Sequence, residues 1–439
     1  MKNTVAIVGR PNVGKSTLFN RLVGERISIV EDTPGVTRDR IFQEATWLDH
    51  RFILIDTGGI DTSSNELIPS MILMQANIAI DTADVILFVV DGKTGPVAMD
   101  FEVATMLRKS QKQVVVAVNK VDTSNLPDDY YDFYKLGFDD IFPISSQQAL
   151  GLGDMLDKVV ELFPIKDDSQ EEDASIKVAI IGKPNAGKSS ILNALVGQNR
   201  SIVSPIAGTT RDSIDEKCRI DGVDYTFIDT SGLRRKSKVY ENIEKYSVLR
   251  AYSAVERADV VLLVIDAQTM VTEQDTKIAG IAHENGKAVI ILVNKWDTIQ
   301  KDSDTMDEYT QNIRNALAYM QYAPMEFISA KTGKRLPNVI KRIDQVYEQA
   351  TKRLSTGVLN DVVGEAVVLN QPPSDKGKRL KIYYATQVST LPPTFVFFIN
   401  DKELFHFSYK RYLENKLREA FGFDGTPINI ISREKNKEK

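Results

Sequence analysis

The sequence predicts an α/β protein in which two tandem copies of a mostly parallel sheet, with helices on both faces, precede a small α+β domain. Three observations support this fold class. A Gly-rich octapeptide occurs twice, each time between an apolar run and a helical pattern. The surrounding residues align at a constant offset of 173 positions through Asp56 and Asp229, which becomes 175 at Asn119 and Asn294. The pattern of elements changes near residue 351. We expect domains at 1–166, 176–350 and 351–439, and an acidic linker at 167–175.

The strands of each copy are near-continuous runs of Val, Ile and Leu. In the first copy they cover 5–8, 52–55, 85–90, 114–118 and 140–144, and in the second 178–181, 225–228, 260–265, 288–293 and 325–328. Such runs, separated by amphipathic segments, are typical of a parallel sheet buried on both faces. Ligands of such sheets bind at the carboxyl ends of the strands. A repeat this long indicates duplicated domains rather than a solenoid.

The third domain has a different order of elements. We predict a helix at 358–369, a Pro/Lys/Gly loop, strands at 380–388 and 394–399, a helix at 409–421 and a strand at 428–431. Residues 351–439 contain 15 Lys and Arg against 10 Asp and Glu, a net charge of +5, while the whole chain carries −5. The other 350 residues therefore carry −10, and the basic third domain is electrostatically distinct.

Composition excludes several classes of protein. The chain has 439 residues, 42% of them hydrophobic, which is enough for packed cores. Cys218 is the single cysteine, so a disulfide framework and a cysteine metal site are excluded, and we expect a small, partly buried hydrophobe there. The first strand begins too early to leave room for a secretory segment. The longest apolar runs are too short to cross a bilayer. We expect a cytoplasmic protein without a membrane span.

The repeated octapeptide has the pattern of a phosphate-binding loop. Its glycines let backbone N–H groups surround a phosphate at the start of a helix, the lysine reaches the β- and γ-phosphates, and the serine hydroxyl binds Mg²⁺. The first copy is Gly9, Arg10, Pro11, Asn12, Val13, Gly14, Lys15 and Ser16, and the second is Gly182, Lys183, Pro184, Asn185, Ala186, Gly187, Lys188 and Ser189.

A second repeated motif follows the third apolar run of each copy. It consists of Asp56, Thr57, Gly58, Gly59 and Ile60, and of Asp229, Thr230, Ser231, Gly232 and Leu233. The aspartate can hold the metal through water, and the last glycine can present an N–H group to the γ-phosphate. Thr37 and Thr210, in polar loops after the first helix, could bind Mg²⁺ when the γ-phosphate is present. A capping role is the alternative for both threonines.

A third motif selects the base. It reads Asn119, Lys120, Val121 and Asp122 in the first copy, and Asn294, Lys295, Trp296 and Asp297 in the second. A carboxylate can accept two hydrogen bonds from guanine, whereas adenine would leave it unpaired, so the ligand is GTP rather than ATP. The following segments, Ser145-Ser146-Gln147 and Ser329-Ala330-Lys331, would place backbone groups near the guanine. The first departs from the usual Ser-Ala-Lys pattern.

These motifs make the chain similar to the bacterial double-Era-like GTPases of the Der (EngA) family, within the TrmE-Era-EngA-like superfamily. The resemblance covers essentially the whole chain. It implies a GTP-hydrolysing switch that assists assembly of the large (50S) ribosomal subunit and carries a KH-like third domain. The implied ligands are GTP, GDP and Mg²⁺, and the implied partners are the large subunit, its rRNA and assembly-factor proteins. We expect a ribosome-associated monomer in the cytoplasm, with Lys15, Thr37, Lys188 and Thr210 as its catalytic residues.

The resemblance also bears on the mechanism of hydrolysis. Ile60 and Leu233 stand where many GTPases have a glutamine that orients the attacking water, and neither side chain can hydrogen-bond. In related GTPases an asparagine in the phosphate-binding loop helps to bind K⁺, which implies that Asn12 and Asn185 bind K⁺ here. A monovalent cation would neutralise developing charge. Capping of the turn is the alternative role for these asparagines.

Two features leave the partner open. The switch segment after Gly232 is basic, and its charges could contact RNA phosphates or an acidic protein surface, or could simply be solvated. The third domain lacks the Gly-x-x-Gly loop with which KH modules clamp RNA, since Gly364 and Gly377 are too far apart. Shape-based contact with rRNA, or docking against the GTPase domains, fits the third domain better. A regulatory module that acts on a protein partner and does not contact RNA is a rival function. A tRNA-modifying enzyme is a third, although no methyl-donor site is visible.

Overall fold

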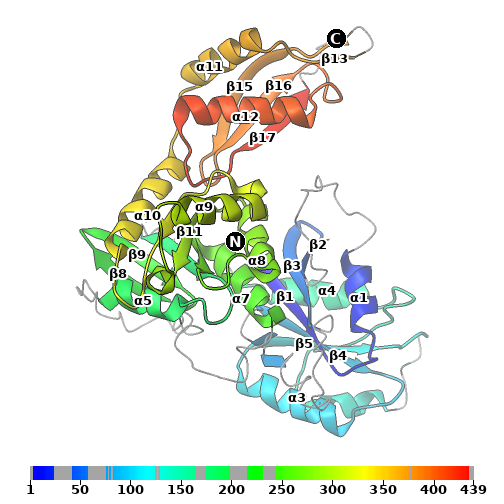
Figure 1. Cartoon of the computed structure of the whole chain (residues 1–439). Coiled ribbons are helices and arrows are strands. Elements are labelled where there is room, and N and C mark those ends of the chain that lie inside the picture. Colours follow the sequence, from blue (N-terminus) through cyan, green and yellow to red (C-terminus); the bar gives the residue numbers. More distant parts are fainter. Residues whose placement is uncertain are drawn as a thin grey trace. The chain divides into compact units, whose positions relative to one another are not determined.

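A computed structural model describes residues 3–23, 42–57, 76–77, 79–80, 83–123, 126, 129–164, 175–197, 215–230, 244–375 and 378–434. The chain forms two compact units, residues 1–172 and 173–439 (Figure 1). Among the described helices none has the length and apolar character that a bilayer crossing needs.

The described part of the first unit contains a six-stranded sheet in the order β2-β3-β1-β4-β5-β6. Its strands are β1 (Asn3–Val8), β2 (Phe42–Trp47), β3 (His50–Asp56), β4 (Val85–Asp91), β5 (Gln113–Asn119) and β6 (Ile141–Pro143). Only the β2–β3 pair among these is antiparallel. The predicted fold class, a mostly parallel sheet, is therefore confirmed, and the antiparallel edge strand β2 is an addition to the strands that we assigned.

Helices cover both faces of this sheet, as the unbroken apolar strands require. Leu18 of α1 (Lys15–Val23) and Met155 of α4 (Leu152–Glu161) share a core with Leu87 of β4. The next residue of β4, Phe88, is equally buried and points to the opposite face because side chains alternate along a strand. There α3 (Ala98–Lys109) packs beside the 3₁₀ helix η2 (Tyr130–Leu136) (Figure 1).

The second unit begins with the same arrangement. Its described sheet has the order β12-β11-β10-β7-β9-β8. The strands are β7 (Ile176–Ile181), β8 (Glu216–Ile220), β9 (Val223–Ile228), β10 (Val260–Asp266), β11 (Ala288–Asn294) and β12 (Met325–Phe327). The helices are α5 (Lys188–Gly197), α7 (Glu244–Arg257), α8 (Glu273–Glu284), α9 (Thr305–Ala316) and α10 (Leu336–Thr351), with short 3₁₀ turns η3 (Trp296–Thr298) and η4 (Ala318–Met320).

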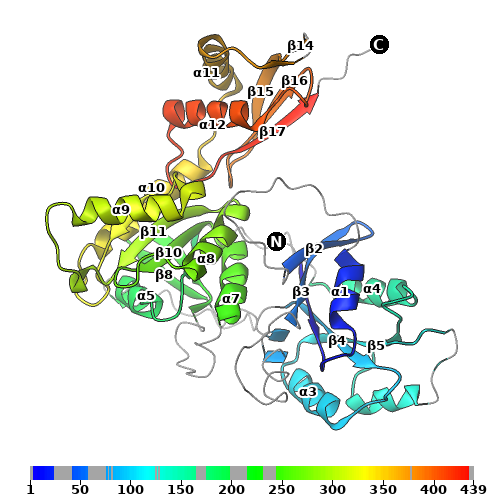
Figure 2. The same cartoon turned by 45° about the vertical axis from the view of Figure 1, so that its right-hand side comes forward.

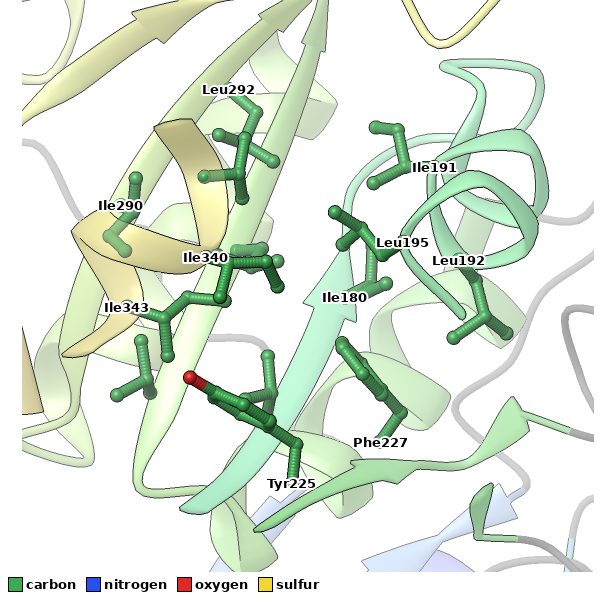
Figure 3. Close-up of a cluster of buried hydrophobic side chains, with 14 of the residues drawn as sticks. Ile180, Ile191, Leu192, Leu195, Tyr225, Phe227, Ile290, Leu292, Ile340 and Ile343 are labelled. Carbon is green, nitrogen blue, oxygen red and sulfur yellow. The ribbon is translucent and has the colours of Figure 1, made fainter. Parts of the chain in front are cut away.

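The core of this sheet domain lies between the sheet and the helices α5 and α10. Ile180 of β7, Leu195 of α5 and Ile340 of α10 are buried together (Figure 3). Cys218 joins this cluster, and burial raises the pKa of its thiol to about 11. The prediction of a small hydrophobe is confirmed. Ser175, which we assigned to the linker, is buried with its Oγ 2.6 Å from Thr226 Oγ1. The rest of the acidic stretch, 165–174, lies outside the described residues.

The remainder of the second unit has the predicted αββαβ order. It consists of α11 (Thr356–Leu369), β15 (Ile382–Ser389), β16 (Thr394–Ile399), α12 (Phe407–Phe421) and β17 (Asn429–Glu434). β16 pairs with β15 antiparallel and with β17 parallel. Leu359 of α11 and Leu413 of α12 bury the Phe395 side of the sheet. Figure 2 shows the two helices and the strands β15, β16 and β17 of this domain. Two short strands that we did not anticipate, β13 (Ser374–Asp375) and β14 (Lys378–Arg379), pair within the Pro/Lys/Gly loop.

Backbone hydrogen bonds join this α+β domain to the sheet domain of the same unit. The Val289 amide of β11 donates to the Gly425 carbonyl at 2.7 Å, and the Gly425 amide donates to the Tyr322 carbonyl at 2.9 Å. The N-terminal end of β11 therefore contacts the segment between α12 and β17. Because these backbone groups are hydrogen-bonded, docking of the domain does not incur the free-energy cost of burying unpaired N–H and C=O groups.

Candidate functional site

Each phosphate-binding loop connects the first strand of its sheet to a helix whose first residue is the loop lysine. Gly14 has φ +95°, and a Cβ there would lie 2.3 Å from Asn119 Nδ2. Gly187 repeats this arrangement with φ +98° and a distance of 2.2 Å to Asn294 Nδ2. Both positions therefore require glycine, for space as well as for backbone conformation.

The loop lysines fold back over their own loops. Lys15 Nζ donates to the carbonyl oxygens of Gly9 at 2.7 Å and Arg10 at 2.9 Å. Lys188 Nζ donates to the carbonyls of Gly182 at 2.8 Å and Lys183 at 2.7 Å. Burial lowers the pKa of Lys15 to about 8, although the nearby Asp56 carboxylate opposes this shift. An ammonium group held in this way over a ring of backbone groups is placed to bind an anion.

The motif after the third apolar run begins beside the phosphate-binding loop. Ser16 Oγ donates to Asp56 Oδ2 at 3.2 Å, which brings a hydroxyl and a carboxylate together at the start of α1. Thr57 Oγ1 donates to the Ile7 carbonyl at 2.5 Å and fixes the end of β3 against β1. In the second domain Asp229 has φ +55° and its amide donates to Asp215 Oδ1 at 3.1 Å.

The asparagine of the base motif joins three segments. Asn119 Nδ2 donates to the Val13 carbonyl at 2.8 Å, and Asn119 Oδ1 accepts from the Ser146 amide at 2.9 Å. Asn294 repeats both bonds, to the Ala186 carbonyl at 2.8 Å and from the Ala330 amide at 3.0 Å. Ser146 therefore presents the same backbone group as Ala330, and the departure of the first copy from Ser-Ala-Lys leaves this contact unchanged.

The aspartate of the base motif is held as an ionised acceptor. Lys93 Nζ and Ser145 Oγ each donate to Asp122 at 2.8 Å. These two hydrogen bonds, that of Lys93 first, keep the pKa of Asp122 below its usual value. In the second domain a hydrogen bond from Ser329 lowers the pKa of Asp297. Trp296 packs edge-on against Tyr309 with ring centroids 5.0 Å apart, which fixes the turn that carries Asp297.

An aspartate that we did not predict as a site residue ends the strand beside each base motif. Asp91 ends β4 and accepts from Lys120 Nζ at 2.6 Å, and Asp266 ends β10 and accepts from Lys295 Nζ at 2.6 Å. These bonds orient the lysine of the motif, which has φ +70° in the first copy and +60° in the second. The repeat itself could have identified the pair, because Asp91 and Asp266 differ by the same 175 positions as Asn119 and Asn294.

Several predicted site residues lie outside the described part of the chain. They are Thr37, Gly58, Gly59, Ile60, Thr210, Ser231, Gly232, Leu233 and the basic segment that follows Gly232. Asn12 and Asn185 are described. Both are exposed and have left-handed backbones, with φ of +66° and +61°. Asparagine tolerates this conformation better than most residues.

Comparison with known proteins identifies the family. A family model described as "50S ribosome-binding GTPase" matches residues 4–120 and 177–295. Another, described as "KH-domain-like of EngA bacterial GTPase enzymes, C-terminal", matches residues 353–433. The chain is 62% identical over 436 residues to "GTPase Der" of Alkaliphilus metalliredigens, with 99% of each chain covered. The chain belongs to the GTPase Der family.

Other Der proteins match over similar lengths. Identity is 60% over 438 residues with the protein of Ruminiclostridium cellulolyticum, covering 100% of this chain and 99% of that one. It is 56% over 434 residues with that of Listeria innocua, covering 99% of each. The family that the motifs indicated is thus confirmed, together with the two GTPase domains and the KH-like domain. Membership of the Der family makes GTP and GDP the ligands of the repeated sites.

Proposed function

We propose that this Der-family GTPase is a switch that assists assembly of the large (50S) ribosomal subunit in the cytoplasm. The observation that carries the proposal is that a full set of guanine-nucleotide motifs occurs twice in the sequence and is followed by a separate basic domain. The description of the matched family model as 50S-binding supports the choice of subunit. The large subunit and its rRNA are then the partners, with assembly-factor proteins as further ones, and the chain acts as a monomer.

The described contacts support a role for the loop lysines at the phosphates and for the base-motif aspartates at the guanine. Lys15 and Lys188 are positioned by loop carbonyls and would bind the β- and γ-phosphates. Their positive charge would stabilise the charge that develops as the bond to the γ-phosphate breaks. The carboxylates of Asp122 and Asp297 would accept the two guanine N–H groups, because hydrogen bonds already keep both ionised.

The donors near the phosphates fit Mg²⁺. Ser16 Oγ and Asp56 Oδ2 are 3.2 Å apart, and hydroxyl and carboxylate oxygens are ligands that Mg²⁺ prefers. We propose that Ser16, Thr37 and Asp56 hold Mg²⁺ in the first site and that Ser189, Thr210 and Asp229 hold it in the second, with Thr37 and Thr210 also serving catalysis. When bound, Mg²⁺ neutralises charge on the phosphate oxygens.

We further propose that K⁺ stimulates hydrolysis. The side chains of Asn12 and Asn185 are exposed at the tips of the two phosphate-binding loops, where their amide oxygens can reach a cation beside the phosphates. Such a cation is needed because Ile60 and Leu233 have no group that could orient water. The loop geometry equally suits a turn-capping asparagine, so the proposal rests on the chemistry of hydrolysis.

Co-sedimentation of the full chain with large ribosomal subunits tests the proposed function. With a non-hydrolysable GTP analogue we expect binding that weakens as salt rises, because the +5 charge of the third domain would contact rRNA phosphates. With GDP we expect binding to be lost. Lys15→Ala and Lys188→Ala should each reduce binding with the GTP analogue. Equal binding with GDP and with the analogue would show that the nucleotide is not the switch.

A further inference from the structure

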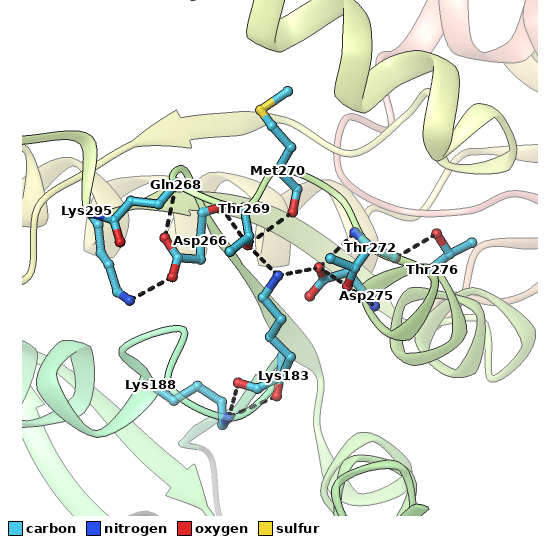
Figure 4. A network of polar contacts seen from close by, with 11 residues as sticks. Lys183, Lys188, Asp266, Gln268, Thr269, Met270, Thr272, Asp275, Thr276 and Lys295 are labelled. Carbon is cyan, nitrogen blue, oxygen red and sulfur yellow. Dashed lines mark hydrogen bonds and ion pairs between the residues drawn. The ribbon is translucent and has the colours of Figure 1, made fainter. Parts of the chain in front are cut away.

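The second residue of each phosphate-binding loop is a cation that contacts the loop after the fourth strand. Lys183 Nζ donates to Thr269 Oγ1 at 2.5 Å and to Asp275 Oδ2 at 3.1 Å (Figure 4). Arg10 lies against the equivalent groups of the first domain. Its Nη2 is 2.5 Å from Thr94 Oγ1, and its Nε forms an ion pair with Asp100 Oδ2 at 3.5 Å without a hydrogen bond. The two arrangements are built from different cations, so the repeat preserves the contact rather than the residue.

The carboxylates that receive these cations are buried in the first turn of the following helix. Asp100 is 1% exposed and Asp275 0%. Each Oδ2 also accepts a hydrogen bond from the backbone amide before its helix, that of Val97 at 3.1 Å or of Thr272 at 3.0 Å. Among the described residues, neither Oδ1 atom has a hydrogen-bond partner. A buried carboxylate with so few donors depends on its neighbouring cation.

The same loop reaches the base side of the site. We name residues 91–97 and 266–272 the bridging loops. In the second, Asp266 Oδ1 accepts from the Gln268 amide at 3.0 Å while Asp266 Oδ2 accepts from Lys295 Nζ at 2.6 Å. The Thr269 amide donates to the Asp266 carbonyl at 3.2 Å. A continuous set of polar contacts therefore connects Lys183 of the phosphate-binding loop to Lys295 of the base motif (Figure 4).

We propose that Arg10 and Lys183 are positioning residues that lock each phosphate-binding loop to its bridging loop and thereby set the rate at which the nucleotide leaves. The proposal rests on the assignment of the two sites to guanine nucleotides. With the lock intact, the phosphate-binding loop and the base motif form one rigid surface, and the nucleotide must break contacts with both before it leaves. In this arrangement each cation is turned toward the first turn of the helix that follows its bridging loop.

The lock is tighter in the second domain. Lys183 is within hydrogen-bond distance of its carboxylate, whereas the Arg10 pair is 3.5 Å apart. Thr272 Oγ1 also lies 2.7 Å from Asp275 Oδ2, while the corresponding residue of the first domain, Val97, has no hydroxyl. Removing the cation should therefore have a larger effect on the second site than on the first.

Dissociation of a fluorescent GDP from the full chain tests the proposal. We expect two kinetic phases, one from each site. Lys183→Met should accelerate one phase about tenfold, and Arg10→Met should accelerate the other less. Lys183→Arg should restore slow release. Lys341→Met, which removes an exposed lysine from α10, is the matched control and should change neither phase.

Two further measurements separate positioning from loss of stability. Thr269→Val keeps the shape of the side chain but removes the hydroxyl, so it should accelerate the same phase as Lys183→Met, without lowering the melting temperature by more than Lys341→Met does. The ratio of the affinity for GDP to the affinity for IDP should fall in Lys183→Met. IDP lacks the guanine amine from which Asp297 would accept a hydrogen bond. Unchanged release in both Lys183→Met and Thr269→Val would overturn the proposal. Failure of the unmodified chain to bind GDP would instead overturn the assignment of the sites.

Discussion

The two GTPase domains share their sheets and their sites but differ at the end of the helix that follows the fourth strand. In the second domain α8 is followed by Gly286, whose Cβ, if present, would lie 2.9 Å from Pro392 Cγ of the KH-like domain. In the first domain the equivalent residue, 175 positions earlier, is Gln111. Both have left-handed backbones, with φ of +65° and +57°. The left-handed backbone alone therefore does not require glycine at position 286, whereas the close approach of Pro392 does.

The same region differs in its aromatic residues. His283 near the end of α8 stacks on Tyr322 with ring centroids 5.9 Å apart, and its Nδ1 lies 3.1 Å from the Tyr322 hydroxyl. The Arg418 guanidinium of α12 lies over the same Tyr322 ring, 5.4 Å from its centroid. The position equivalent to His283 is Arg108 in the first domain. Duplication thus kept the contacts among the phosphate-binding and base motifs in both copies, while the surface that holds the KH-like domain is built from residues of the second copy.

The largest expected difference between the sites concerns pH. Lys15 is buried and has a pKa of about 8, whereas Lys188 is less buried. The protonated form of Lys15 predominates below pH 8 and is the form that binds phosphate. Between pH 8 and 9 a proton must be taken up on binding, so the GTP affinity of the first site should fall by up to about tenfold. Nucleotide titration at several pH values measures this. An equal loss of GTP affinity at both sites over this pH range would contradict the prediction.

The difference at the helix end can be tested by exchanging its residues. Gly286→Gln should force Pro392 away and destabilise docking of the KH-like domain by about 1–3 kcal/mol. The reverse exchange, Gln111→Gly, is the matched control and should change stability by less than about 1 kcal/mol. Hydrogen exchange of the Val289 amide, which donates to the Gly425 carbonyl, reports docking directly. Unchanged protection of this amide in Gly286→Gln would contradict the account of the interface.

The smallest effect should come from His283. Burial lowers its pKa in the folded protein. Its stabilising contribution is therefore complete above the unfolded pKa of about 6.5 and is lost as the pH falls, because the unfolded chain binds a proton more readily. The loss cannot exceed about 1.4 kcal/mol per pH unit for one group. Thermal unfolding from pH 7.5 to 5.5 should show less dependence on pH in His283→Gln. If thermal unfolding of His283→Gln and of the unmodified chain depends on pH in the same way, His283 does not have this role.

Much of the fold was predictable because its signals are local and repeated. The run Val85–Val90 predicted a central strand, and β4 (Val85–Asp91) is buried throughout. The antiparallel edge strand β2 (Phe42–Trp47) contains three polar residues among its six, so it lacks such a run. The residues that dock the KH-like domain were not predictable, since Gly286 and Pro392 are 106 residues apart.

The phosphate and base motifs were found from their spacing, but their supporting residues were not. Asp100 and Asp275 resemble ordinary acidic residues in the first turn of a helix, and a single copy would carry no further meaning. Their importance follows from burial and from the cations of the phosphate-binding loops, which only the folded chain brings near. The equal spacing of 175 residues was a signal in the sequence that could have directed attention to both.

The central claim is that the duplication preserves two complete guanine-nucleotide sites. Equilibrium binding of labelled GDP to the full chain measures their number directly. We expect two GDP molecules per chain, no competition by ADP, and one GDP per chain in Asp122→Asn or in Asp297→Asn at concentrations that saturate the unmodified protein. A stoichiometry of one in the unmodified chain, or of two in both variants, would contradict the claim.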